Sequence, residues 1–211
     1  MNTPRRALLA LAALGALSAL LGACGDGSGA PREPAVTLTR EAWGALPPIG
    51  SLLSRQSPVA VTIHHTAAAQ NPDRSLSEKM LRLQSFSQRP SALAGGGEKP
   101  AWGDVPYHYV IGVNGGVAEG RAPVYAGDSN TQYDLRGHIQ IAVEGRFDTE
   151  RPTAAQLWAL ERLVDEVRVR WAIPASAVAG HRARGPATLC PGRNLEVWIA
   201  RYRARKGVPA P

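Results

Sequence analysis

Segments with strand-like and helix-like patterns alternate along the chain, and this alternation limits the folds that it can adopt. Residues 59–64 are rich in β-branched side chains, which predicts a strand. Ser75 with Glu78, and later Thr153 with Gln156, form capping boxes ahead of apolar residues at helical spacing. A strand followed by a helix is the repeating unit of an α/β domain.

One hairpin interrupts this alternation. Residues 107–113 alternate as a strand, Asn114-Gly115 is a strong hairpin signal, and Val117 begins the partner strand. Residues 138–143 predict a further strand, and residues 195–202 a last helix. We therefore expect an α/β fold with a central mixed β-sheet flanked by helices on both faces. The length of 211 residues suits one compact domain with extensions.

The N-terminal segment has the features of an export signal. Arg5 and Arg6 precede residues 7–23, which carry no charge and lie at the short edge of the length of a spanning helix. This stretch ends in Leu-Gly-Ala-Cys24, which resembles the lipobox of bacterial lipoproteins. We expect residues 1–23 to be a signal peptide and Cys24 to be the lipidated N-terminus. An uncleaved anchor or an ordinary signal is the alternative.

These features predict the domain limits and the location. Residues 24–37 read as a flexible tether, residues 38–203 as the folded domain, and residues 204–211 as a short basic tail. The protein is expected to be exported and anchored through lipid to a bacterial membrane, at its periplasmic face or at the cell surface. The net charge of +7 suits an anionic polymer, but no basic run is interleaved with aromatic residues, so a nucleic-acid partner is not expected.

The second cysteine needs a role of its own. If Cys24 carries lipid, Cys190 has no disulfide partner in the chain and is a buried thiol, a nucleophile or a metal ligand. His64 ends a predicted strand, and His181 precedes Cys190 by nine residues. Catalytic zinc sites use three protein ligands and leave one position open. His64, His181 and Cys190 are one candidate set, although such spacing alone is weak support.

Seven short blocks occur along the domain in a fixed order. They are residues 39–45 (TREAWGA), 61–67 (VTIHHTA), 84–86 (QSF), 103–109 (GDVPYHY), 119–121 (EGR), 180–182 (GHR) and 188–192 (TLCPG). Together they resemble the type-2 N-acetylmuramoyl-L-alanine amidase family, which includes phage lysozyme-type amidases and animal peptidoglycan recognition proteins. The resemblance covers roughly residues 38–203.

The resemblance implies a fold, an activity and a set of site residues. The fold is that of the peptidoglycan recognition proteins, and the activity is zinc-dependent cleavage of the amide between N-acetylmuramic acid and L-alanine in peptidoglycan. One Zn²⁺ per chain would bind to His64, His181 and Cys190. Tyr107 stands at the family's catalytic tyrosine. Thr188 is the second candidate catalytic residue, as a hydrogen-bond donor, and it stands where phage members carry lysine and animal members carry threonine. A monomer is expected.

The chain also departs from the family pattern. Residues 89–101 form a longer connection than usual, which we expect to be a mobile loop beside the substrate groove. The interval from His181 to Cys190 is one residue longer than the common spacing. Cytosolic recycling relatives carry a carboxylate where this chain has Ala142, and Glu144 follows two residues later with an open role. His65 is expected to be structural, and His108 and His138 are assigned to structure or to the groove rim.

Two other functions fit parts of the pattern. A peptidoglycan-binding module of the same fold would bind without cutting, usually after loss of the cysteine ligand. A cysteine peptidase would use Cys190 as nucleophile and His181 as base, but it would leave His64 without a role.

Overall fold

The computed structural model describes residues 35–93, 96–185 and 187–209. The predicted signal peptide, Cys24 and most of the tether lie outside the described residues. No helix in the described ranges combines the length and the apolar character that crossing a bilayer requires.

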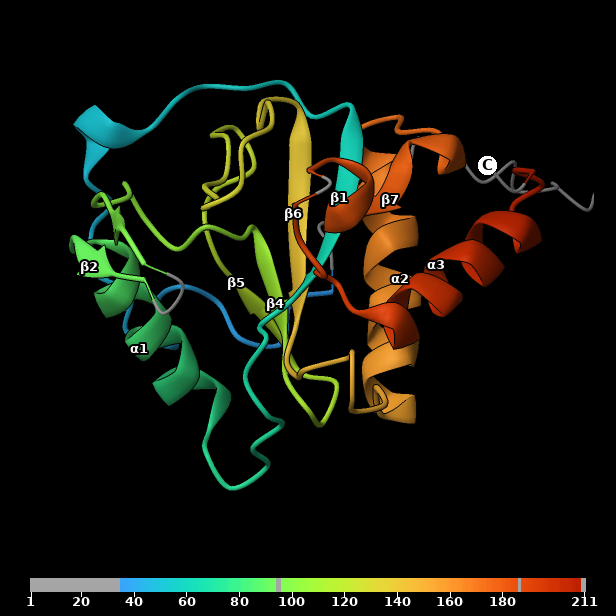
Figure 1. Cartoon of the computed structure of the whole chain (residues 1–211), viewed down its shortest axis with the longest axis horizontal. Coiled ribbons are helices and arrows are strands. Elements are labelled where there is room, and N and C mark those ends of the chain that lie inside the picture. Colours follow the sequence, from blue (N-terminus) through green and yellow to red (C-terminus); the bar gives the residue numbers. More distant parts are fainter. Residues whose placement is uncertain (1–34, 94–95, 186, 210–211) are drawn as a thin grey trace, which may run out of the picture. The chain divides into compact units, whose positions relative to one another are not determined.

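A five-stranded sheet forms the centre of the domain, with the strand order β5-β4-β6-β1-β7 (Figure 1). Its strands are β1 (Ala60–His65), β4 (Tyr109–Ile111), β5 (Val117–Glu119), β6 (His138–Val143) and β7 (Val178–Gly180). β1, β4, β6 and β7 run parallel, whereas β5 is antiparallel to β4. The expected mixed sheet is confirmed.

Helices cover both faces of this sheet, as expected. α1 (Leu76–Ser87) lies on one side, and α2 (Ala154–Arg170) and α3 (Arg193–Arg205) lie on the other (Figure 1). Both predicted capping boxes form, at the start of α1 and at the start of α2. The short 3-10 helices are η1 (Gly50–Leu52), η2 (Ala175–Ala177) and η3 (His181–Ala183).

The alternation of side chains along β1 determines which residues face each layer. Val61 and Ile63 are fully buried in the core that α2 and α3 share with the sheet. Thr62 and His64 point to the opposite face of the sheet. In the strand register His64 lies beside Ala142 of β6, whose side chain is buried on that same face. His64 therefore emerges on the α1 side of the sheet, near the carboxyl end of its strand.

The strand predicted at residues 107–113 is shorter in the structure, because β4 spans only Tyr109–Ile111. Tyr107 lies in the segment just before it. This segment is held by buried Arg121, whose guanidinium donates to the carbonyls of Asp104, Val105 and Ala126. This side chain, two residues beyond β5, adds to the backbone hydrogen bonds that Tyr107 and His108 make with Arg121, Gly120 and Gln140. The hairpin at Asn114-Gly115 forms as expected.

The connection at residues 89–101 was expected to be a loop, and in the structure its described part contains two short strands. β2 (Ser91–Ala92) pairs antiparallel with β3 (Glu98–Lys99). Lys99 is buried, and its Nζ donates to the carbonyls of Ser87, Arg89 and Pro100 at 2.9, 2.7 and 2.8 Å. The same ammonium lies 4.4 Å from the ring centre of Trp102. A buried cation therefore anchors the segment, where few apolar residues were available to do so.

The limits of the folded domain differ slightly from the expected ones. Thr37 and Leu38 donate backbone hydrogen bonds to Val117, so the end of the predicted tether lies along β5. At the other terminus α3 continues to Arg205, two residues into the predicted basic tail.

Candidate functional site

Three candidate metal ligands meet where β1 and β7 end side by side. His64 is the penultimate residue of β1, and His181 begins η3 directly after β7. Cys190 lies in the loop before α3. One donor atom from each of these buried side chains lies within 4.8 Å of the other two, and Cys190 Sγ is 3.6 Å from His64 Nδ1. The structure thus brings together the three residues that the resemblance implied.

Gly180 allows the two C-terminal ligand segments to approach each other. A Cβ atom at this position would lie 2.7 Å from Pro191 Cδ, closer than side-chain atoms tolerate. Arg182 N donates to Cys190 O at 2.7 Å, which ties the residue after His181 to the cysteine itself. The glycine and this hydrogen bond together set the separation of the two ligands.

Gln140 orients the His64 ring. Its Oε1 lies 2.5 Å from His64 Nε2, and Tyr133 donates to the same oxygen at 3.3 Å. Because an amide oxygen only accepts, Nε2 carries the proton and Nδ1 presents its lone pair toward Cys190. Metal-binding histidines commonly use their second nitrogen in this way.

A comparable contact holds His181. Thr131 Oγ1 lies 2.5 Å from His181 Nε2, and the Tyr133 ring packs 5.2 Å from the His181 ring. Sequence reasoning did not identify Gln140, Thr131 or Tyr133. Only Gln140 had a usable signal, because it shares the strand face of Ala142, which the alternation of β6 places toward His64.

Burial sets the protonation states of the three candidate ligands. It lowers the pKa of His64 to about 3, with a further contribution from nearby His181, and lowers the pKa of His181 to about 4. Burial also raises the pKa of the Cys190 thiol to about 12. Both imidazoles are neutral at pH 7, whereas the thiol ionises only beside a cation. Two imidazoles and one such thiol fit the ligand set of a catalytic zinc site.

A cleft of about 280 Å³ opens beside these side chains. The Tyr107 ring lies 5.2 Å from the His64 ring, and burial raises the pKa of Tyr107 above its usual range, so that its hydroxyl stays protonated. Thr188 Oγ1 accepts a hydrogen bond from Cys190 N at 3.1 Å. The cleft is lined by His64, His65, Thr66, Ala67, Trp102, Pro106, Tyr107, Asp128, Ser129, Asn130, Thr131, His181, Thr188 and Cys190.

The other histidines have structural contacts. His65 lines the cleft, while its backbone N–H points at Cys190 Sγ at 3.3 Å and its Nδ1 accepts from Phe147 N. His138 contacts Thr62 Oγ1 at 2.7 Å through Nδ1.

His108 is fully buried beneath the cleft. Its Nδ1 accepts from Gln140 N at 2.7 Å, and its Nε2 donates to Tyr125 O at 2.8 Å. It thereby supports the strand that carries Gln140.

Glu144 does not line the cleft. Its carboxylate pairs with Lys79 at 2.8 Å and accepts from the backbone N–H groups of Asn71 and Val113. These contacts tie α1 and the loop before it to the end of β6. Glu144 is therefore a structural carboxylate, although its side chain lies on the same face as His64.

Comparison with known proteins places this arrangement in a family. Residues 54–193 match the family model described as N-acetylmuramoyl-L-alanine amidase. Peptidoglycan-recognition protein SD of Drosophila simulans is 32% identical over 172 residues, which cover 78% of this chain and 84% of that protein. Human N-acetylmuramoyl-L-alanine amidase is 29% identical, and the match covers 72% of this chain but only 26% of the human protein.

Solved structures agree with these sequence matches. The crystal structure of Drosophila peptidoglycan recognition protein SD superposes with a TM-score of 0.64 at 31% identity, covering 78% of this chain and 93% of that one. The ectodomain complex of proteins LCa and LCx bound to tracheal cytotoxin gives a TM-score of 0.64 at 30% identity, with 78% and 94% coverage. The chain belongs to the N-acetylmuramoyl-L-alanine amidase family and has the peptidoglycan recognition protein fold.

Proposed function

We propose that the protein is a zinc amidase that hydrolyses the amide between N-acetylmuramic acid and L-alanine in bacterial peptidoglycan. The observation that carries this proposal is the convergence of His64, His181 and Cys190 at one end of a cleft that also contains Tyr107. Family membership supports the substrate class. Relatives of the same fold have been crystallised with tracheal cytotoxin, described for one of them as monomeric diaminopimelic acid-type peptidoglycan.

Each side chain has a defined part in this proposal. His64 and His181 would hold the ion as neutral ligands, and Cys190 as a thiolate. Zinc held there would polarise the scissile carbonyl and lower the pKa of an attacking water. Protonated Tyr107 would donate a hydrogen bond to the oxyanion that develops on the substrate. Thr188, through its bond to Cys190 N, would hold the cysteine loop in place.

The site gives less support to a cysteine peptidase. Such an enzyme needs a thiolate beside a protonated imidazole, but burial favours neutral Cys190 and neutral His181. Cys190 Sγ also contacts His64 rather than the proposed base. A binding-only module remains the second candidate, since several relatives are recognition proteins.

One experiment separates these functions. Purified protein is incubated with peptidoglycan, with and without a chelator, and the released fragments are identified by mass spectrometry. We expect free stem peptides beginning with L-alanine, their loss on chelation and their return with zinc. Cys190→Ser and the double variant His64→Ala, His181→Ala should bind less zinc. Stoichiometric zinc without any released peptide would identify a binding module, and chelator-resistant cleavage would remove the zinc mechanism.

We also propose that the protein works at a membrane surface as a monomer that carries its own lipid anchor. The basis is the segment that ends at Cys24 and the tether that follows it. Such an anchor would hold the cleft within reach of the cell wall.

A further inference from the structure

An uncharged stretch of the chain lies exposed at the surface before β1. Residues 42–54 contain no charged side chain, and within them Leu46, Ile49 and Leu52 are 57%, 37% and 46% exposed. The 3-10 helix η1, which lies in this stretch, contributes no buried residue. It lies on the α1 side of the sheet, away from α2 and α3 (Figure 1). Large aliphatic side chains that gather on a surface in this way indicate contact with an apolar partner.

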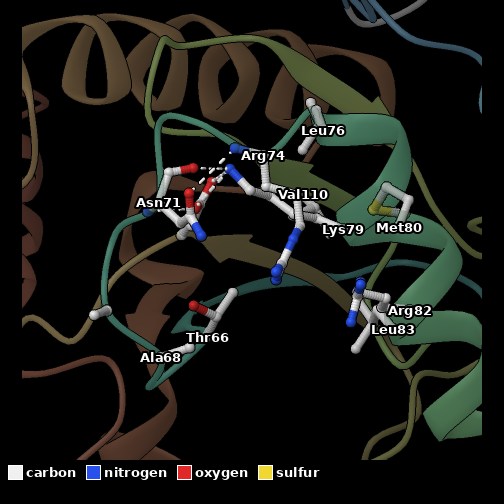
Figure 2. Close-up of a pocket in the computed structure, with 12 residues that line it drawn as sticks. Thr66, Ala68, Asn71, Arg74, Leu76, Lys79, Met80, Arg82, Leu83 and Val110 are labelled. Atoms are coloured by element: carbon white, nitrogen blue, oxygen red, sulfur yellow. Dashed lines mark hydrogen bonds and ion pairs between the residues drawn. The ribbon is translucent and has the colours of Figure 1, made fainter.

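The helix α1 extends this exposed surface. Toward the sheet it contributes Met80 and Leu83 to the lining of a pocket of about 310 Å³ (Figure 2). Leu81 does not line that pocket and is 41% exposed. Its Cδ2 lies 4.0 Å from the place that a Cβ atom at Gly44 would take, so Leu81 borders the uncharged stretch. Together, four side chains form an apolar face: Leu46, Ile49, Leu52 and Leu81.

Several backbone groups of this apolar face already have hydrogen-bond partners. Two residues of the stretch are prolines, which have no N–H group. The Gln84 side chain bonds both the N–H and the carbonyl of Leu46, at 2.8 and 2.9 Å. The N–H of Ile49 donates to Gly103 O at 2.7 Å. A segment with fewer unpaired backbone groups enters an apolar medium at a smaller cost.

Arginine side chains flank the apolar face. Arg55 directly follows the uncharged stretch. Arg89 follows Gln88, whose amide donates to the carbonyl of Pro47 at 3.0 Å. Both arginines are exposed, and neither forms an ion pair with a described residue. With exposed Glu41 at the other end of the stretch, the flanking charge is positive, which complements the head groups of an anionic bilayer.

The tether is long enough to bring this face to a membrane. Residues 24–34 join the predicted lipid site to the first described residue, Ala35. Fully extended, a segment of this length spans at most about 40 Å. The radius of gyration of a domain of this size is about 16 Å. The anchored domain can therefore turn its apolar face toward the bilayer.

We propose that the apolar face binds the anionic lipid surface to which the protein is anchored, with Arg55 and Arg89 at the level of the head groups. This proposal rests on the membrane location proposed above and not on the amidase activity. Gly103, which accepts from Ile49, directly follows Trp102 of the cleft. Binding through this face thereby fixes one wall of the cleft relative to the bilayer.

Vesicle co-sedimentation tests this proposal on the full mature chain before acylation of Cys24, so that no lipid on the protein provides the binding. The vesicles contain phosphatidylethanolamine with phosphatidylglycerol, or phosphatidylcholine alone. Ile49→Ser with Leu52→Ser should keep the wild-type Tm and weaken binding to both kinds of vesicle about tenfold. Val169→Ser with Val197→Ser is the matched control, because it removes two exposed side chains from α2 and α3, and it should change neither affinity.

The arginines are tested separately from the aliphatic side chains. Arg55→Gln with Arg89→Gln should weaken binding to the anionic vesicles roughly 10- to 30-fold and leave binding to the neutral vesicles unchanged. Arg193→Gln with Arg201→Gln is the charge control, since both arginines are exposed on α3. An equal loss in this control would mean that the overall charge, and not the proposed face, binds the lipid.

Further outcomes decide between the bilayer and other occupants. Wild-type protein that binds neither kind of vesicle would overturn the proposal. A wild-type dimer without vesicles, which the Ile49→Ser, Leu52→Ser pair converts to a monomer, would assign the face to a second copy of the chain instead. Vesicle binding with the expected losses would support the face even if the protein released no peptide, a result that would refute the amidase proposal alone.

Discussion

His64 Nε2 lies 2.5 Å from Gln140 Oε1, and this contact determines which nitrogen of His64 faces Cys190. Gln140 belongs to β6 and His64 to the adjacent strand β1. The orientation of a candidate metal ligand therefore depends on a neighbouring strand that carries no ligand itself.

Replacing Gln140 with leucine should weaken zinc binding about 10- to 100-fold, because outer hydrogen bonds of this kind orient the ligand ring. Competition with a fluorescent chelator measures the change. Tyr133→Phe is the control, because it removes only the longer contact to the same oxygen and should have a much smaller effect. Unchanged affinity in Gln140→Leu would mean that His64 is oriented by packing alone.

Replacing Tyr107 with phenylalanine should lower kcat about 10²- to 10³-fold and leave KM and zinc content nearly unchanged. The ring and its packing are retained, while the hydroxyl that would stabilise the oxyanion is lost. Thr188→Ala should cost less, and Thr188→Lys tests whether the phage-type charge can act at that position. If kcat of Tyr107→Phe at saturating zinc stayed within about twofold of wild type, Tyr107 would be only a packing residue.

Replacing Lys99 with methionine should reduce the free energy of unfolding by about 2 kcal/mol and lower Tm by several degrees. Three carbonyl groups would lose their donor while the side-chain volume stayed similar. KM should rise as well, since Trp102 packs on Lys99 and lines the cleft. Lys206→Met is the control, because its exposed ion pair with Asp165 should contribute under about 1 kcal/mol. An unchanged Tm in Lys99→Met would mean that Lys99 does not anchor residues 89–101, as a mobile loop would require.

The metal-free protein should lose stability as the pH falls from about 6.5 toward 4, partly through His108. Burial lowers the pKa of His108 from 6.5 to about 4 in the folded chain. Below pH 6.5 the unfolded chain therefore binds a proton that the folded chain does not, and this favours unfolding by up to about 3 kcal/mol. Denaturant titrations from pH 7 to 4 should show a smaller decline for His108→Gln than for wild type. If stability fell equally with pH in the two proteins, His108 would be excluded as a source of the pH dependence.

Replacing Cys24 with alanine should leave unprocessed precursor and release the processed domain from the membrane fraction. The predicted lipid is the basis of anchoring, and a single alanine cannot carry it. Fractionation followed by immunoblotting checks this outcome, with Cys190→Ser as a control that keeps the lipidation site. Normal processing and retention in Cys24→Ala would make the segment an ordinary signal or an uncleaved anchor.

Local patterns predicted the fold best where local contacts create it. Both capping boxes and the Asn114-Gly115 hairpin form as expected, because each depends on neighbours in the chain. The strand predicted at residues 107–113 was too long at both ends, and the contacts that Arg121 makes with the segment before β4 from beyond the hairpin could not be read from the sequence. Lys99 escaped notice for a similar reason, since an isolated lysine in a sequence predicts exposure.

The candidate site shows the same difference between residues that motifs identify and residues that long-range contacts define. The family motifs identified His64, His181 and Cys190, and the fold brings them together. Their hydrogen-bond partners carry no motif, because Gln140 and Thr131 are defined by register and loop packing rather than by spacing. Glu144 could not be placed from the sequence, since Lys79 on a different element engages it.

The backbone contact between Arg182 and Cys190 has a consequence for how this protein can vary. That contact and the lack of a side chain at Gly180, beside Pro191, set how close the two ligand segments lie, and Arg184 and Thr188 add contacts within the interval between them. The interval should therefore tolerate few changes of length beside Thr188, because an insertion there would be expected to displace Cys190, whose backbone N–H donates to that side chain.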